Sequence, residues 1–247
     1  MALTRLFVRG KLQPGLSLQL DPEQARYLGR VLRLRPGESL RVFNADCGEF
    51  AAVMESLGKT TATVAVGEAL PSRTESPLRV HLVQGVSRGE RMDIIVQKAT
   101  ELGVKRVTPV LTEFGVVKLA GERADKRRDH WQKIAISAAE QCGRVRPPLV
   151  DMPLPLKTWF GSKTRDSDID LILRPGAPTA VTALAAPRTK VCLLIGPEGG
   201  FSEIEYGDAA VSGFTPVSLG PRVLRTETAA MAAIAVVQAL WGDLGPD

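Results

Sequence analysis

Two glycine- and proline-rich segments near the C-terminus have the residue types of a ligand-binding site. The first, Gly196-Pro197-Glu198-Gly199-Gly200, follows the uncharged run at residues 191–195, a pattern that predicts a buried strand ending in a tight loop. The second, Ser218-Leu219-Gly220-Pro221, precedes Arg225-Thr226-Glu227-Thr228. Because glycine lacks a Cβ, main-chain groups in such loops can contact a bound molecule directly. We expect two loops at neighbouring strand ends to enclose one pocket.

A third loop of the same type, Arg174-Pro175-Gly176, follows an apolar strand predicted at residues 169–173. None of the loops contains the GxxxxGK[ST] motif of nucleoside-triphosphate sites, a GxGxxG motif after a strand or a GxSxG nucleophile motif. The loops therefore favour an adenosine-type molecule held by main-chain groups over a phosphate held by a lysine.

A parallel α/β sheet is the element that must position these loops. Strands are predicted at residues 78–86 and 107–111, and the helix between them has an apolar face from Met92 to Leu102 before Gly103. This strand–helix–strand order is typical of a parallel sheet. Further helices are predicted from Trp131 to Gly143, after a Ser202–Glu205 capping box, and beyond a Thr226 or Thr228 cap. The buried stripe of that last helix is predicted to be Ala230, Ala233, Ile234, Val237, Leu240 and Trp241.

The first part of the chain has a different pattern. Asp21 and Pro22 predict the start of a helix whose apolar residues are Ala25, Leu28, Val31 and Leu32. Short strands around residues 40–43, 50–55 and 60–66 then indicate a meander or small barrel. We place a first domain at residues 1–70, a polar linker, PSRTESP, at 71–77 and a second domain at 78–247.

Composition limits the classes of protein to be considered. The chain has 247 residues, of which 44% are hydrophobic and 24% charged, enough to bury a substantial core. No apolar run approaches the roughly 18 residues of a membrane span, and the N-terminus lacks a signal-peptide core. Cys47, Cys142 and Cys192 form no CxxC pair, and His81 and His130 are the only histidines. We expect a cytoplasmic protein without disulfides, metal or membrane association.

Positive charge is concentrated away from the glycine loops. Residues 1–150 contain 24 Lys and Arg against 16 Asp and Glu, whereas residues 151–247 contain 8 against 11. This distribution predicts that a polyanion binds the first part of the chain. The candidate RNA-binding residues are Arg26, Arg30, Arg33, Arg88, Arg91, Lys118 and Arg144. For Arg26, Arg30, Arg33, Arg88 and Arg91, a solvated surface is the alternative.

Four blocks along the chain carry a family resemblance. They are QKATELGV at residues 97–104, WQKIAISAAEQCGR at 131–144, LIGPEGGFS at 194–202 and LGPRVLRTETA at 219–229. These blocks resemble the signature motifs of RsmE-type 16S ribosomal RNA uridine-N3 methyltransferases. That family belongs to the SPOUT class, and the resemblance implies an α/β trefoil-knot domain preceded by a small PUA-like β-barrel.

The resemblance also implies a site for S-adenosylmethionine against the three loops. The cofactor-binding residues carried over by motif are Leu173, Arg174, Pro175, Ile195, Gly196, Pro197, Glu198, Gly199, Gly200, Ser218, Leu219, Gly220, Arg222, Val223, Leu224 and Thr226. The implied partners are 16S ribosomal RNA of the small subunit and a second copy of the chain.

Methylation at N3 of uracil requires positioning, a group that takes the imide proton and a positive field. Arg225 is the candidate for the field, because it precedes a helix N-terminus whose dipole adds to its charge; a salt bridge to Glu227 or Glu198 is the alternative. Glu198, Glu227 and Glu140 are the candidate proton acceptors, and each could instead brace a loop or cap.

Three other functions remain open from the sequence. The cofactor pocket does not determine the acceptor, so methylation of another atom such as a ribose 2′-hydroxyl is one alternative. A noncatalytic RNA-binding assembly factor is the second. A nicotinamide oxidoreductase is the third and is disfavoured by the missing GxGxxG motif.

Overall fold

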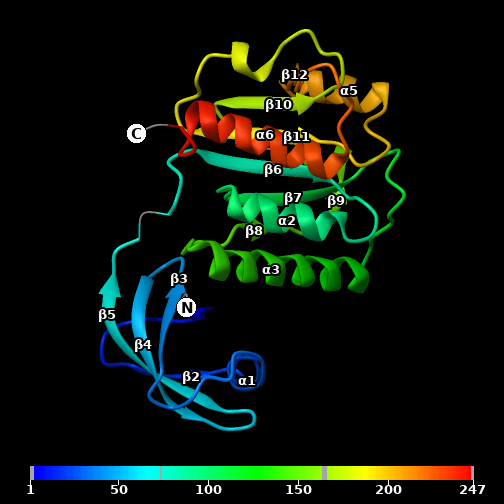
Figure 1. Cartoon of the computed structure of the whole chain (residues 1–247). Coiled ribbons are helices and arrows are strands. Elements are labelled where there is room, and N and C mark those ends of the chain that lie inside the picture. The colour runs from blue at the N-terminus through cyan, green and yellow to red at the C-terminus, as the bar shows by residue number, and fades with distance from the viewer. Residues whose placement is uncertain (1–2, 73, 163–165, 246–247) are drawn as a thin grey trace. The chain divides into compact units, whose positions relative to one another are not determined.

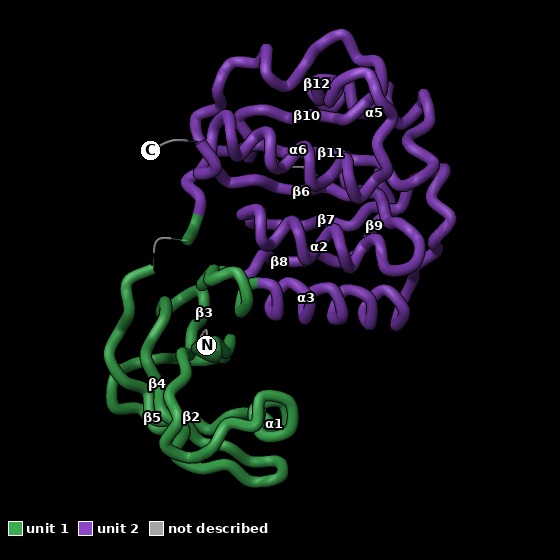
Figure 2. The backbone as a smooth tube through the Cα atoms, viewed as in Figure 1, with its two compact units in different colours: residues 1–75, 139–146 green, residues 76–138, 147–247 purple. Residues whose placement is uncertain are grey.

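A computed structural model describes residues 3–72, 74–162 and 166–245. The chain divides into two compact units (Figure 2): residues 1–75 with 139–146, and residues 76–138 with 147–247. Residue 73 of the expected linker and residues 163–165 lie outside the described residues. The domain limits at 1–70 and 78–247 stay a prediction.

The first unit contains a mainly antiparallel sheet (Figure 1). Its strands, in the spatial order β1-β3-β4-β5-β2, are β1 (Arg5–Phe7), β3 (Ser39–Asn44), β4 (Gly48–Leu57), β5 (Ala62–Leu70) and β2 (Ser17–Leu20). Only β1 and β3 pair in parallel. Alternate residues such as Leu40 and Val42 are fully buried in one core with Leu28 of the helical segment. The three expected strands are confirmed, and β1 and β2 were not predicted.

The expected first helix is shorter and less regular than its sequence pattern indicated. Asp21 caps helix α1 (Pro22–Arg26), but a π-helical turn follows at Tyr27–Val31. Val31 and Leu32, which were expected to share the helical spacing of Ala25 and Leu28, are 65% and 37% exposed, whereas Ala25 and Leu28 are buried. The cause is the bond from the Leu32 N–H to the Tyr27 carbonyl, which widens the turn and rotates the residues after Leu28 off the buried face.

The second unit is a parallel sheet covered by helices on both faces (Figure 1). The spatial order is β12-β10-β11-β6-β7-β8, with β9 also pairing with β7. The strands are β6 (Arg79–Gly85), β7 (Arg106–Leu111), β8 (Leu149–Val150), β9 (Leu154–Pro155), β10 (Ile169–Leu173), β11 (Lys190–Ile195) and β12 (Thr215–Val217). The helices are α2 (Arg91–Glu101), α3 (Glu122–Cys142), α4 (Leu156–Ser162), α5 (Glu203–Val211) and α6 (Thr226–Trp241). The last residues of α3 belong to the first unit.

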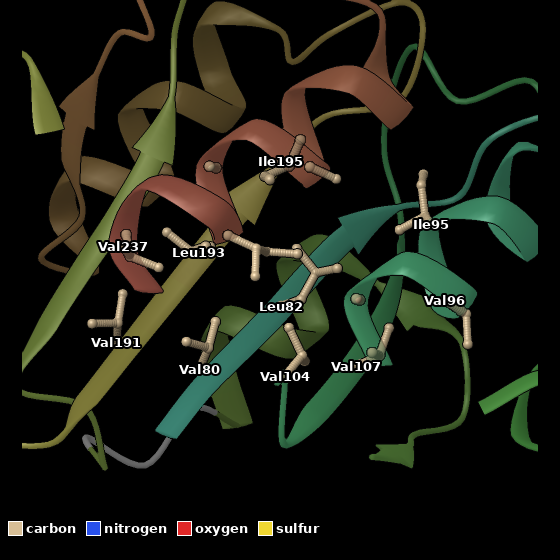
Figure 3. Packing of buried hydrophobic residues seen from close by; sticks show 14 of the residues in the cluster. Val80, Leu82, Ile95, Val96, Val104, Val107, Val191, Leu193, Ile195 and Val237 are labelled. Atoms are coloured by element: carbon tan, nitrogen blue, oxygen red, sulfur yellow. The ribbon is translucent and has the colours of Figure 1, made fainter. Parts of the chain in front are cut away.

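Alternating residues of the central strands build the two cores. Val80 and Leu82 of β6 lie in one cluster with Leu193 and Val104, as Figure 3 shows, whereas Val83 belongs to a second cluster that includes Trp159 of α4. The main cluster also contains Val191, Leu193 and Ile195 of β11, Ile95 and Val96 of α2, and Ile234 and Val237 of α6. Burial on both faces explains why the interior positions of β6 and β11 are largely apolar.

The chain segments that follow β10 and β12 pair with each other. The segment after β10 contains a 3₁₀ turn at Val181–Ala183, and its residue Ala180 pairs with Ser218 directly after β12. From the sheet edge at β12 the chain then returns to α6, which contacts β11, α2 and the 3₁₀ turn. The loops after β10 and β12 are thereby held together.

The last helix corrects two expectations. Its N-cap is Arg225, whose side chain makes no capping bond, and Thr226 is the first helical residue instead of the cap. The Thr226 hydroxyl donates to the Gly196 carbonyl at 2.7 Å, a partner outside the helix. Leu240 was expected in the buried stripe but is 43% exposed, whereas Ala233, Ile234 and Val237 are buried as expected.

A candidate cofactor pocket at the carboxyl ends of the strands

The three predicted loops meet at one cavity of about 510 Å³. They follow β10, β11 and β12, which run parallel and therefore end at the same edge of the sheet. The lining residues are Arg91, Leu173, Arg174, Pro175, Ile195, Gly196, Pro197, Glu198, Gly200, Phe201, Tyr206, Val217, Ser218, Leu219, Gly220, Arg222, Val223, Leu224, Arg225, Thr226, Glu227 and Ala229. Of the expected cofactor-binding residues, all except Gly199 line this cavity.

Two residues at the end of β6, Gln84 and Gly85, contact the glycine loop. Gln84 is fully buried, and its side-chain amide lies 3.0 Å from the Thr226 hydroxyl and 3.3 Å from the Gly196 carbonyl. A Cβ on Gly85 would lie 2.5 Å from the Pro197 nitrogen, so only glycine allows this close approach. Neither supporting residue was predicted from the sequence, although both lie near the end of a strand predicted at residues 78–86.

Glycine is needed at positions 196, 220 and 199 for different structural reasons. A Cβ on Gly196 would lie 3.1 Å from Gly200 Cα, so this residue permits the loop to fold back on itself. Gly220 has φ 92°, a left-handed conformation that side chains disfavour. Gly199 does not line the cavity, and a Cβ there would lie 2.9 Å from the carbonyl oxygen of Phe114, so close packing accounts for this glycine. Its expected contact with the cofactor stays a prediction.

An arginine joins two of the candidate carboxylates. Arg91 Nη1 donates to Glu198 Oε1 at 2.7 Å, and Arg91 Nε lies 3.7 Å from Glu227 Oε2. Partial burial acts to raise the pKa of Glu198, but hydrogen bonds from its own N–H, the Arg88 N–H and Arg91 outweigh it and lower that pKa. Arg91, a candidate RNA-binding residue, lies in the pocket wall, and its contact with RNA stays a prediction.

Arg225 remains unpaired beside this network. Its guanidinium forms no hydrogen bond or ion pair within the part of the chain that the structure describes. The alternative salt bridge to Glu198 or Glu227 is absent, because Arg91 contacts both carboxylates. Arg225 is thus an exposed cation at the start of α6, where the helix dipole adds to its positive potential.

Comparisons with known proteins identify the family to which this chain belongs. Residues 74–238 match the RNA methyltransferase domain and residues 20–67 the RNA methyltransferase PUA domain. The ribosomal RNA small subunit methyltransferase E of Buchnera aphidicola subsp. Schizaphis graminum is 33% identical over 242 residues, which cover 98% of both chains. This chain belongs to the ribosomal RNA small subunit methyltransferase E family. The family member from Bacillus subtilis is 28% identical and shares 92% of this chain and 91% of its own length.

Solved structures of relatives have the same fold. A family member from Neisseria gonorrhoeae bound to S-adenosyl methionine has a TM-score of 0.91 at 35% identity, covering 98% of this chain and all of that one. A Legionella pneumophila methyltransferase in complex with the cofactor SAM has a TM-score of 0.94 at 42% identity, with coverage of 98% and 100%. The expected fold class, a SPOUT-type methyltransferase domain with an N-terminal PUA-like domain, is confirmed.

Two of the expected site residues, Glu140 and Arg144, form structural contacts within the first unit. Glu140 does not line the pocket: its Oε1 accepts the Phe7 N–H at 2.9 Å. Burial raises the pKa of Glu140, and the bond from Phe7 opposes that shift. Arg144 was expected to contact RNA, but its side chain is 3% exposed and pairs with Glu75 at 3.0 Å. Such a buried pair makes Arg144 a structural residue.

The other candidate RNA-binding residues are exposed. These are Arg26, Arg30, Arg33, Arg88 and Lys118.

Within the described residues, no three His, Cys, Asp or Glu side chains gather as a metal-binding group. None of the helices in residues 3–72, 74–162 and 166–245 combines the length and apolar character that a membrane span requires.

Proposed function

We propose that this chain transfers the methyl group of S-adenosylmethionine to N3 of a uridine in 16S ribosomal RNA. The observation that carries the proposal is the single cavity formed by three loops after β10, β11 and β12. Two solved relatives that share this fold over nearly the whole chain are bound to that cofactor. The uridine N3 atom follows from the resemblance of the sequence blocks to RsmE-type enzymes.

The residues of the cavity fit such a cofactor. A volume of about 510 Å³ is within the range of small-molecule sites. A Cβ on Gly196 would crowd the loop at 3.1 Å from Gly200 Cα, and Gly200 itself has a left-handed φ of 70°, so both positions favour glycine and keep main-chain groups accessible. We propose that the loops at Leu173–Pro175, Ile195–Gly200 and Ser218–Leu224 hold the adenosine and methionine portions. When bound, S-adenosylmethionine supplies an electrophilic methyl group on its sulfonium.

We propose distinct roles for the charged residues. Methylation of N3 would form an N–C bond at the expense of the sulfonium S–CH3 bond and would require loss of the imide proton, and Glu227 is our candidate for its acceptor. Its Oε2 is buried and has no hydrogen-bond partner, whereas Glu198 Oε1 already accepts from Arg88 and Arg91. The unpaired Arg225 stabilises the negative charge that develops on the uracil. Arg91 keeps the two carboxylates in place.

The RNA would be held chiefly by the exposed arginines of the first unit, through its phosphates. We also propose that the protein is a homodimer and acts in the cytoplasm. Analytical ultracentrifugation at several protein concentrations tests the dimer directly, since a monomer mass throughout would contradict it.

The decisive experiment identifies the methylated nucleoside. Purified full-length protein is incubated with isotope-labelled S-adenosylmethionine and 16S ribosomal RNA, either free or in small subunits, and the digested RNA is analysed by mass spectrometry. We expect labelled 3-methyluridine. A label on a ribose 2′-oxygen would identify the other acceptor, and RNA binding without any cofactor binding in calorimetry would identify an assembly factor. The Leu224→Arg variant, which fills the cavity, serves as the control for cofactor dependence.

A further inference from the structure

The π-helical turn of the first unit exposes a group of apolar side chains. Tyr27 is 40% exposed, Val31 65% and Leu32 37%. The Leu32 N–H bonds to the Tyr27 carbonyl at 3.1 Å, so these residues lie one wide turn apart on the same segment. We call the three residues the Tyr27 platform. All three count among the exposed large hydrophobic residues, whereas the neighbouring Leu28 and Leu34 are buried.

The backbone of this segment is irregular in two places. The π turn at Tyr27–Val31 replaces the α-helix, and Arg33 has φ 56°, a left-handed conformation that is uncommon for residues other than glycine. π turns are rare and occur frequently at functional sites. Left-handed non-glycine residues likewise persist where the surrounding structure requires them. The exposed apolar residues lie within the π turn and directly before Arg33, between the two irregularities.

The charge around the platform indicates which partner covers it. Arg26, Arg30 and Arg33 are exposed, and their guanidiniums form no ion pair within the described residues. No acidic residue occurs between Glu23 and Glu38. Two copies of this surface facing one another would bring like charges together, which disfavours self-association. An aromatic ring among unpaired arginines is instead the arrangement that binds single-stranded nucleic acid.

We propose that the Tyr27 platform binds an unpaired nucleotide of the ribosomal RNA. One base stacks on the Tyr27 ring and contacts Val31 and Leu32, while Arg26 and Arg30 bind the flanking phosphates. The inference rests on the proposed function, because it assumes that the substrate is RNA. It adds the class of RNA recognised: a loop, bulge or end, since bases inside a duplex are not available for stacking.

The test compares a short single-stranded RNA with a blunt duplex by fluorescence anisotropy, using the full-length protein at fixed salt. Wild-type protein should bind the single strand more tightly. Tyr27→Ala should weaken single-strand binding about 5- to 150-fold, the effect of losing one base–aromatic stack, and change duplex binding little. Tyr27→Phe, which keeps the ring, should bind as wild type. Val53→Ala, which shortens another exposed apolar residue of the same unit, is the matched control.

Arg26→Ala should behave differently from Tyr27→Ala. It should weaken binding of both RNAs and reduce the dependence of affinity on salt, because it removes a phosphate contact. An unchanged single-strand affinity of Tyr27→Ala, or an equal loss for both RNAs, would overturn the platform. A changed sedimentation mass of Tyr27→Ala with unchanged RNA affinity would also overturn it and assign the surface to a protein partner.

Failure of the Tyr27 platform and failure of the proposed function give different experimental results. If wild-type protein forms 3-methyluridine while Tyr27→Ala binds RNA normally, only the platform is refuted. If wild-type protein neither binds nor methylates RNA, the proposed function itself fails.

Discussion

Replacing Gly85 by alanine tests whether the end of β6 positions the cofactor loop. The new Cβ would lie 2.3 Å from Pro197 Cδ and 2.5 Å from Pro197 N, far inside the roughly 3.5–4.0 Å of a favourable carbon contact. β6 is bonded to β11 on one side and β7 on the other, so the strand has little freedom to move. The loop from Gly196 to Gly200 must shift instead.

The size of the effect follows from the severity of this clash. Overpacking a close-packed site costs typically 1–3 kcal/mol, and we expect the upper end here. If the loop takes up the strain by leaving its binding position, affinity for S-adenosylmethionine falls by roughly 100-fold. Isothermal titration calorimetry measures that affinity, and thermal unfolding of the same variant measures any strain that stays in the sheet.

Gly207→Ala is the matched control for Gly85→Ala. Gly207 lies in α5, is exposed, and a Cβ there meets no atom within 4 Å. Alanine should therefore raise the stability of the helix by about 0.5–1 kcal/mol and leave cofactor affinity unchanged. If Gly85→Ala kept both the affinity and the unfolding temperature of the wild type, the support of the loop by β6 would be refuted.

Three further substitutions test the pocket and the first unit. Thr226→Val removes the hydroxyl that donates to the Gly196 carbonyl, and calorimetry should show cofactor affinity lower by about 5- to 150-fold, the effect of a lost buried hydrogen bond; wild-type affinity would contradict this. Glu227→Gln should lower kcat for RNA methylation about 100-fold or more with little change in cofactor affinity, whereas the exposed Glu122→Gln should keep wild-type kcat in the same assay. Burial raises the pKa of Glu140 above its ordinary 4.5, so its favourable contribution to stability is complete below that pH and is lost as pH rises through the folded value. The unfolding free energy of wild type minus Glu140→Gln should therefore decline over this window in denaturant titrations, and a constant difference would be evidence against the buried carboxyl.

The regular parts of the fold were predictable because their sequence patterns are local. The strand–helix–strand unit around α2, the capping box at Ser202 and the ends of the helices at Gly103 and Gly143 were read from spacing and residue type. The π turn after α1 was not, because it depends on tertiary packing that the periodicity does not encode. Short elements such as β1 and α4 carry too few residues to show a period.

The pocket was predictable to the extent that its residues belong to loops. Main-chain contacts require glycine and proline in short segments, and such residues are visible in a sequence. The roles of charged residues were not visible, because they depend on which partner is nearest in space. Arg91 and Arg144 were both expected at RNA, yet one pairs with Glu198 in the pocket and the other with Glu75 in the first unit. Gln84 was missed because its contact with the Gly196 carbonyl joins residues far apart in sequence.

The paired Arg91 and the unpaired Arg225 suit a pocket that must bind both a cationic cofactor and a base that becomes negatively charged. A sulfonium cofactor is cationic and favours nearby carboxylates, whereas a uracil that loses its proton favours nearby cations. Arg91 pairs closely with Glu198 and lies farther from Glu227, so its charge is largely compensated within the wall. Arg225 has no such partner and stands at the positive end of α6. Under the proposed function, we expect the sulfonium to lie near the compensated part of the wall and the RNA base to approach from the side of Arg225.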